Sequence, residues 1–99
     1  MSQEILSIAI FRPLPGHEEA SLTTIRDLIA ALAAGGYSRD VLYRDAKSDH
    51  EYILLRYWKS EEARRSALED SNVLRCWARL AHEIRTIKIY ETLQEAWGE

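Results

Sequence analysis

Two segments of this chain are apolar on both sides, and the rest of the sequence is arranged around them. Residues 4–11 read EILSIAIF and residues 51–59 read EYILLRYWK, with the β-branched and aromatic residues that are typical of strands. Side chains alternate along a strand, so each predicted strand has two faces. In the second segment, one face carries Ile53, Leu55 and Tyr57, and the other carries Tyr52, Leu54 and Trp58. Both faces therefore require cover from other parts of the molecule.

The pattern predicts a helix over residues 17–34, because apolar residues recur there at spacings of three and four. This apolar stripe consists of Leu22, Ile25, Leu28, Ile29 and Leu32. Gly35 and Gly36 follow directly and are expected to end the helix, since glycine adopts the left-handed capping conformation without steric cost.

A second helix is predicted directly after residues 51–59, in two halves. Ser60 is the expected N-cap of the first half, residues 61–70. The polar residues 70–72 predict a break, where Ser71 or Asn72 caps the second half, residues 73–84. Leu74, Trp77 and Ala81 are expected to share one face of that second half.

Two less apolar strands complete the prediction. Residues 37–45 form the first, which a polar turn at residues 47–50 joins to the strand at 51–59 as an antiparallel hairpin. Residues 85–93 form the second, with Ile87 and Ile89 on one side and Thr86, Lys88 and Tyr90 on the other.

The resulting order, β-α-β-β-α-β, predicts a ferredoxin-like α+β fold in which one antiparallel sheet of four strands has two helices on one face. The 99 residues are expected to form a single domain. The other face of the sheet is left bare and apolar, and the tail at residues 95–99 is too short to cover it. A second copy of the chain is the expected cover, so the sequence predicts a homodimer.

Composition and charge exclude several classes of partner. The formal net charge is −3 and the chain contains no basic block, which argues against nucleic acid. No apolar run reaches the roughly 18 residues that a membrane span needs. The start of the chain does not resemble a secretory signal, so a cytoplasmic protein is expected. The three histidines and the single cysteine lie too far apart to show a metal-ligand spacing.

The chain resembles the antibiotic biosynthesis monooxygenase domain, a member of the dimeric α/β-barrel superfamily, over residues 4–93. The resemblance rests on FRPLPGHEE at residues 11–19, the glycine pair, the polar hairpin and RYWKSEEARRSALEDSN at residues 56–72. Within the last stretch, Trp58, Ser60 and Ser71 match the family's strand-ending tryptophan, its capping serine and its serine-containing break. The resemblance implies a homodimer in which two sheets pack into a barrel, with a small-molecule pocket in each protomer.

The resemblance also implies an activity, because some members oxidise aromatic polyketides with molecular oxygen and without metal or flavin. Other relatives degrade haem, using an Asn in the first strand and a His in the second half of the second helix. The first strand has no Asn here, and the expected ligand position falls at Ala78, one turn before His82. Haem is therefore not an expected cofactor, and a haem-degrading enzyme is the less favoured reading.

Oxygenation without a cofactor needs a polar group that takes a phenolic proton, a group that holds the resulting anion, and a dry pocket. The candidates for proton transfer and anion binding are His82, Tyr57 and Arg56, and those for substrate binding are Trp58, Trp77, Arg44 and Tyr90. No metal ligands are assigned.

Each candidate also has a purely structural interpretation. Trp58 and Trp77 suit an apolar core, and His82 suits the solvated end of a helix. Arg44 and Arg56 can pair across neighbouring strands or with a partner subunit, while the tyrosines suit a dimer contact. Two functions stay open: a small cofactor-independent monooxygenase for an aromatic or quinol-like molecule, or a non-catalytic small-molecule-binding or stress-related module of the same fold.

Overall fold

Four strands and three helices follow one another in a computed structural model that describes residues 5–98. The elements are β1 (Ile5–Pro13), α1 (Glu18–Ala34), β2 (Ser38–Arg44), β3 (Tyr52–Trp58), α2 (Glu61–Ala67), α3 (Ser71–Leu80) and β4 (Ile84–Leu93). Glu4, the expected first residue of the first strand, and Glu99, the last residue of the tail, lie outside the described residues. The predicted elements are otherwise all found, with ends that differ by a few residues.

The strands form one antiparallel sheet in the order β2-β3-β1-β4. β1 is central and pairs with both β3 and β4, and β2 pairs with β3 through the predicted hairpin. In this hairpin, Asp40 lies directly opposite Arg56, and on the other side of β3 Ser7 lies opposite the same arginine. This arrangement confirms the ferredoxin-like α+β fold and brings three polar residues into one row across the sheet.

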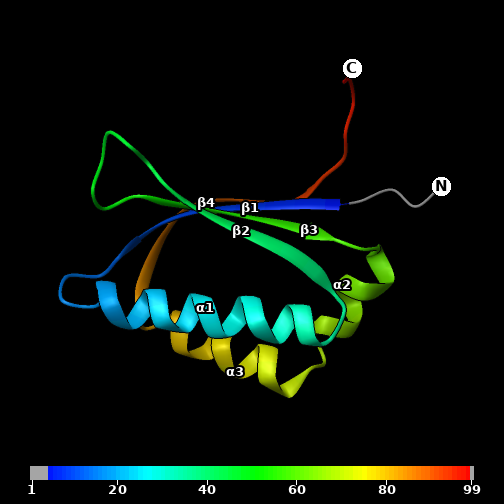
Figure 1. Cartoon of the computed structure of the whole chain (residues 1–99), viewed down its shortest axis with the longest axis horizontal. Helices are drawn as coiled ribbons and strands as arrows, with labels where there is room; N and C mark the ends of the chain where they lie inside the picture. The colour runs from blue at the N-terminus through cyan, green and yellow to red at the C-terminus, as the bar shows by residue number, and fades with distance from the viewer. Residues whose placement is uncertain (1–4, 99) are drawn as a thin grey trace.

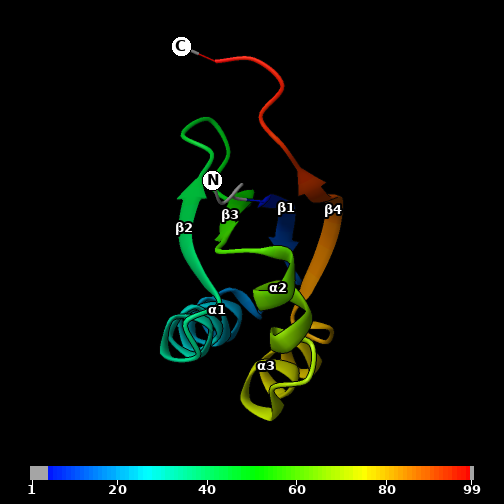
Figure 2. The same cartoon turned by 90° about the vertical axis from the view of Figure 1, so that its right-hand side faces the viewer.

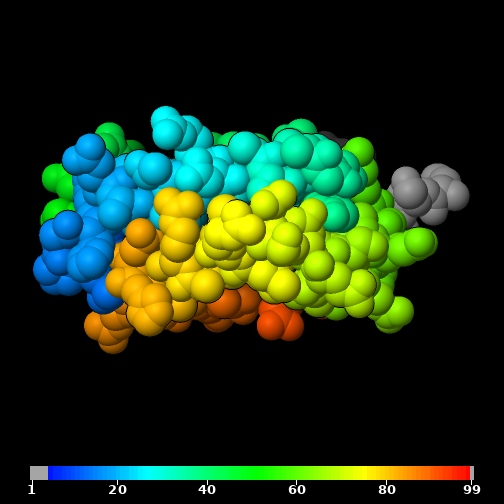
Figure 3. All heavy atoms as spheres, turned by 90° about the horizontal axis from the view of Figure 1, so that it is seen from below, coloured from blue at the N-terminus to red at the C-terminus, as the bar shows by residue number. Residues whose placement is uncertain are grey.

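The helices cover one face of the sheet (Figure 1). In the end-on view α1 lies under β2 and β3, whereas α2 and α3 lie under β1 and β4 (Figure 2). Seen from the helix side, α1 and α3 lie side by side, and β4 shows beyond α3 at the edge (Figure 3). Phe11, Leu54 and Trp58 point from the sheet toward this layer and are almost fully buried, as are Leu28 and Leu32 of α1.

None of the helices found in residues 5–98 lies on the opposite face of the sheet (Figure 1). Because Leu54 and Trp58 point toward the helices, the alternating Leu55 and Tyr57 point to this outer face. Tyr43 and Tyr90 also lie on it, opposite Ile53 and Ile8, and their exposed fractions are 54% and 38%. The tail rises away from the sheet on this side in Figure 1. The sheet therefore has the two apolar faces expected from the sequence, and the helices cover one of them.

The helix ends follow local hydrogen bonds. Ser60 caps α2 as predicted, since its side chain accepts a hydrogen bond from the Ala63 amide at 3.0 Å. The prediction of Ser71 or Asn72 as the cap of α3 is wrong, because Asp70 accepts from the amides of Asn72 and Val73 at 2.8 and 3.3 Å. A carboxylate at this position satisfies two free amides and also favours the helix dipole.

The buried face of α3 also differs from the prediction. Val73, Cys76 and Leu80 are buried, whereas Leu74 has an exposed fraction of 43%. Trp77 packs at the margin of the core and is partly buried. The buried side of α3 is therefore offset by about one residue from the expected stripe.

The expected alternation along β4 is wrong as well. Thr86 and Ile89 both face the helix side, because they pair with Phe11 and Ala9 of β1. The register shifts between Ile10 and Phe11 of β1 and shifts again further along. A bulge adds one residue to a strand and reverses the side on which the following residues lie.

Candidate functional site

A cavity of about 420 Å³ lies between the helix-facing side of the sheet and the three helices. This volume is within the roughly 300–1,000 Å³ of typical small-molecule sites. Its wall is mostly apolar and comes from every element except β2. The residues that line it are Ser7, Ile8, Ala9, Phe11, Ile25, Leu28, Leu54, Arg56, Trp58, Arg64, Leu68, Trp77, Leu80, Ala81, Ile84, Thr86, Ile89 and Glu91.

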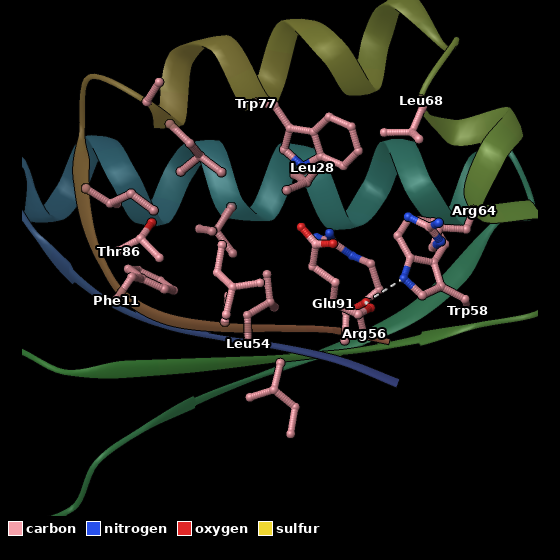
Figure 4. Close-up of a pocket in the computed structure, with 18 residues that line it drawn as sticks. Phe11, Leu28, Leu54, Arg56, Trp58, Arg64, Leu68, Trp77, Thr86 and Glu91 are labelled. Atoms are coloured by element: carbon pink, nitrogen blue, oxygen red, sulfur yellow. Dashed lines mark hydrogen bonds between the residues drawn. The ribbon is translucent and has the colours of Figure 1, made fainter. Parts of the chain in front are cut away.

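The polar residues gather toward one end of this cavity (Figure 4). We call this the polar end and define it by Ser7, Arg56, Trp58, Arg64 and Glu91. At the other end lie Phe11 and Thr86, and the Trp77 ring covers the middle from α3 (Figure 4). The cavity thus combines a mostly apolar wall with charged and hydrogen-bonding groups at one end.

Ser7 connects the polar end to the sheet. Its hydroxyl accepts a hydrogen bond from Trp58 Nε1 at 2.8 Å and donates one to the backbone carbonyl of Glu91. Trp58 is almost fully buried, with an exposed fraction of 3%, so this bond satisfies an indole N–H that would otherwise be costly to bury. The Ser7 hydroxyl thus joins β1 to β3 and to β4 at the polar end.

Arg56 is the most deeply placed charge in the cavity wall. Its Nε donates to Asp40 Oδ2 at 2.9 Å, and the exposed fractions of the two side chains are 11% and 1%. The guanidinium carbon lies 5.4 Å from the centre of the Trp58 ring. The Nη2 atom is buried and has no hydrogen-bond partner among residues 5–98. A buried donor without a partner has a desolvation cost.

Arg64 reaches the polar end from the first turns of α2, where the Ser60 cap sets the start of the helix. It forms two hydrogen bonds to Glu61, Nε to Oε2 at 3.0 Å and Nη2 to Oε1 at 2.8 Å. These bonds from Arg64 lower the pKa of Glu61, and the Glu61 carboxylate raises the pKa of Arg64. The pair therefore stays ionised across the neutral range.

Three of the seven predicted site residues lie together in this cavity. Arg56 and Trp58 come from β3, two residues apart and on the same face, and Trp77 comes from α3. The alternative prediction, that Arg56 pairs with a residue on a neighbouring strand, is also confirmed, because Arg56 pairs with Asp40 of β2. A structural role and a place in the cavity wall are thus combined in one residue.

The other four predicted residues lie outside the cavity wall. Tyr57 falls on the outer face, where the Arg39 guanidinium lies 4.4 Å from its ring centre. Tyr90 also points outward, with Lys88 Nζ 4.8 Å from its ring centre. Arg44 is exposed at the end of β2. Each placement follows from strand alternation or from position at a strand end.

His82, the fourth of these, is exposed in the turn that follows α3 and does not line the cavity. Among residues 5–98, no group of three or more His, Cys, Asp and Glu side chains is placed to hold a metal ion. Along the same stretch, no helix has the length and apolar character to cross a bilayer.

Sequence reasoning missed Asp40, Glu91, Arg64 and Ser7. For Asp40 a signal was present, since counting back from the predicted hairpin turn places it opposite Arg56, and opposite charges at paired positions attract. Glu91 could not be placed, because the bulges in β4 decide which of its side chains reach the cavity.

Comparison with known proteins gives one family match. The family model described as antibiotic biosynthesis monooxygenase matches residues 5–77. That range contains β1 to β3, α1, α2 and most of α3, and therefore Arg56, Trp58 and Trp77. Among curated proteins, none matches the chain.

Several solved structures share the fold. SnoaB, a cofactor-independent oxygenase from Streptomyces nogalater, has 18% identity and a TM-score of 0.78, with 96% of this chain and 98% of that chain covered. PA3566 from Pseudomonas aeruginosa has 23% identity and a TM-score of 0.81, with 98% of both chains covered. Rv0793 from Mycobacterium tuberculosis has 20% identity and a TM-score of 0.74, with 95% and 99% covered. At these identities the likeness establishes the fold.

Proposed function

This chain belongs to the antibiotic biosynthesis monooxygenase family, and from that premise we propose that it is a small cofactor-independent monooxygenase. Its substrate is an aromatic or quinol-like small molecule that binds between the sheet and the helices. The observation that carries the proposal is the apolar cavity of about 420 Å³ with the Arg56 guanidinium at its polar end. The oxygenase activity named for SnoaB, which has the same fold, supports it.

The proposed reaction is the oxidation of a hydroquinone by molecular oxygen, which gives a hydroxyquinone and water. One oxygen atom of O₂ enters the ring, the other leaves as water, and the hydroquinone supplies all four electrons. The substrate must first lose a phenolic proton, since the anion is the electron-rich form that reacts with oxygen. Arg56 is proposed to hold the developing oxyanion, and Glu91, the carboxylate of the cavity wall, to accept the proton.

The apolar part of the wall has a separate role in this proposal. Trp58 and Trp77, with Leu28 and Leu54, bind the flat ring and exclude water from it. Exclusion of water strengthens the interaction of Arg56 with the oxyanion, because the local dielectric constant is lower. These residues orient the substrate, while the charge chemistry is confined to the polar end.

Oxygen uptake with 1,4-naphthohydroquinone tests the proposal. We expect uptake above the spontaneous rate, with one O₂ consumed per quinol. Arg56→Met should lower kcat/KM by about tenfold or more, because a charge-assisted hydrogen bond is worth roughly 1.5–3 kcal/mol. Arg12→Met is the matched control, since the side chain of Arg12 is 54% exposed and outside the cavity wall.

The alternative is a binding module that uses the same cavity without turnover. It would be favoured if no quinol or phenol of a broad panel raised oxygen uptake while one of them still raised Tm. Added haem provides a third comparison, because a Soret shift would favour a haem-degrading relative.

We also propose that the protein acts as a homodimer in which the outer faces of two sheets pack together. The support is the uncovered face with Leu55, Tyr57, Tyr43 and Tyr90 on it. Light scattering at micromolar concentration tests this, and a particle of 11.4 kDa would contradict it. A cytoplasmic location stays a prediction, for which expression with fractionation is the test.

A further inference from the structure

The carboxylate of Asp40 is held in one orientation beneath the polar end of the cavity. Oδ2 accepts from Arg56 Nε at 2.9 Å, and Oδ1 accepts from the Ser38 hydroxyl at 2.8 Å. Its side chain is 1% exposed, and Ser38 is 6% exposed. Both oxygens are therefore engaged, and water has almost no access to either group.

This arrangement compensates the positive charge of Arg56 before any ligand arrives. Arg64, the other arginine of the cavity wall, is compensated in the same way by its two bonds to Glu61. Glu91 adds a negative charge to the same end. Within residues 5–98, the polar end therefore offers hydrogen-bond donors, and each arginine of its wall is paired with a carboxylate.

The charge state decides which ligands this end can accept. A ligand carboxylate would lose its hydration on entry and would place a second anion on a guanidinium already paired with Asp40. An uncharged hydroxyl or carbonyl oxygen has a much smaller desolvation cost. It can still accept a hydrogen bond from the Arg56 guanidinium, in which, among residues 5–98, Nε is the nitrogen that already has a partner.

We propose that Asp40 is a positioning residue that makes the cavity select ligands whose polar group is an uncharged hydroxyl or carbonyl oxygen, and that removal of its charge turns the preference toward carboxylates. The proposal rests on the proposed function in that the cavity is taken as the ligand site, and it defines the substrate class more narrowly. Asp40 acts through Arg56, which it both orients and neutralises.

Binding of matched naphthalene probes tests this selectivity directly. The probes are 2-naphthol and 2-naphthamide, which are uncharged at pH 7, and 2-naphthoate, which has nearly the shape of the amide but is ionised. Trp58 and Trp77 line the cavity, so quenching of their fluorescence reports binding. Trp97, which is 93% exposed, is replaced by Phe to remove its background signal.

For the wild-type protein, the Kd of 2-naphthamide should be lower than that of 2-naphthoate by about tenfold or more. Asp40→Asn keeps an oxygen that can accept from Nε but removes the charge, so 2-naphthoate should become the tighter ligand. Asp27→Asn is the matched control, because Asp27 pairs with Arg79 on the exposed surface and should leave the ratio unchanged.

If Asp40→Asn does not fold, the ratio of the Kd values of 2-naphthoate and 2-naphthamide for the wild-type protein still tests the proposal. A carboxylate that binds as tightly as the amide overturns it, as does an Asp40→Asn ratio equal to that of the wild type. Failure of all three probes to bind the folded protein also overturns it. All titrations are run under argon, so turnover plays no part in them.

The two proposals can then be separated. Absence of oxygen uptake together with the expected preference would remove the monooxygenase proposal and leave the role of Asp40 intact. Oxygen uptake together with a preference for carboxylates would remove the proposed role of Asp40 and leave the monooxygenase proposal intact.

Discussion

Replacement of Asp40 by Ala should be among the most destabilising changes to a charged residue in this protein. The variant leaves the Arg56 charge buried without a carboxylate, and breaking a buried pair in this way costs about 3–5 kcal/mol. The side chains of the pair are 11% and 1% exposed, so the Arg56 charge would stay largely desolvated after the loss of its partner. A single domain of this size typically has a free energy of unfolding of about 5–15 kcal/mol, so the loss is a large fraction.

Urea denaturation followed by far-UV circular dichroism measures this loss, at one fixed protein concentration because assembly would shift the midpoint. In thermal melts the same variant should lower Tm by roughly 12 °C or more, since 1 kcal/mol corresponds to about 4–8 °C in a domain of 60–100 residues. The double variant Asp40→Leu with Arg56→Met should recover much of the stability, because it removes both charges together.

The chain supplies a matched control for this experiment. Asp27→Ala breaks the ion pair with Arg79, whose N–O distance is 3.2 Å but whose partners are 43% and 44% exposed. Exposed pairs of this kind contribute about 0.2–1 kcal/mol. If Asp40→Ala costs no more than Asp27→Ala, the Arg56 charge is not held in a buried site, and the reasoning about the polar end is refuted.

Three further changes test other parts of the structure. Asp70→Asn should lower the free energy of unfolding at neutral pH, and the difference from wild type should shrink as pH falls. Hydrogen bonds from the Tyr37 hydroxyl and from backbone amides lower the pKa of Asp70 in the folded state. The stability that the Asp70 carboxylate contributes is therefore fully present above its unfolded pKa of about 3.9 and is lost as pH falls through its folded pKa. Urea midpoints between pH 7 and pH 2 measure this loss. Leu55→Glu places a charge on the outer face and should reduce the particle to 11.4 kDa in light scattering, whereas an unchanged mass at twice that value would show that the face is not the contact. Trp58→Phe removes the bond to the Ser7 hydroxyl and should cost about 1–3 kcal/mol in urea denaturation, so an unchanged midpoint would show that this bond does not contribute.

The two strands with apolar residues on both sides could be predicted almost in full, because alternation is a strong signal where every position is apolar. The predicted sides of Ile53 and Leu55 against Leu54 and Trp58 agree with the structure. The conclusion that one face of the sheet has no helix cover followed from these residues and from the order of elements. Whether a second copy of the chain covers it stays a prediction.

Two of the errors are shifts of a predicted pattern by one residue. A bulge in β4 puts Thr86 on the same side as Ile89, and in α3 Val73 and Cys76 are buried in place of Leu74. The spacing of Val73, Cys76, Trp77 and Leu80 did carry a signal for the buried side of α3. The bulge leaves no trace in hydrophobic periodicity, because it depends on the pairing of β4 with β1. For the same reason Glu91 could not be assigned to the cavity from sequence.

The pairing of Asp40 with Arg56 shows why a charged residue in the wall of an apolar cavity need not be a simple anion-binding site. An arginine without a partner would be too costly to bury and would attract any anion. Once it is paired, the same guanidinium can be buried beside Trp58, and its remaining donors become hydrogen-bonding groups rather than a net charge. Such a group interacts weakly with an uncharged phenol and more strongly with the oxyanion that forms when the phenol loses its proton. Interactions that strengthen as the reaction proceeds are those that lower a barrier, so the compensated arginine suits a catalyst better than a cavity that only stores an anion.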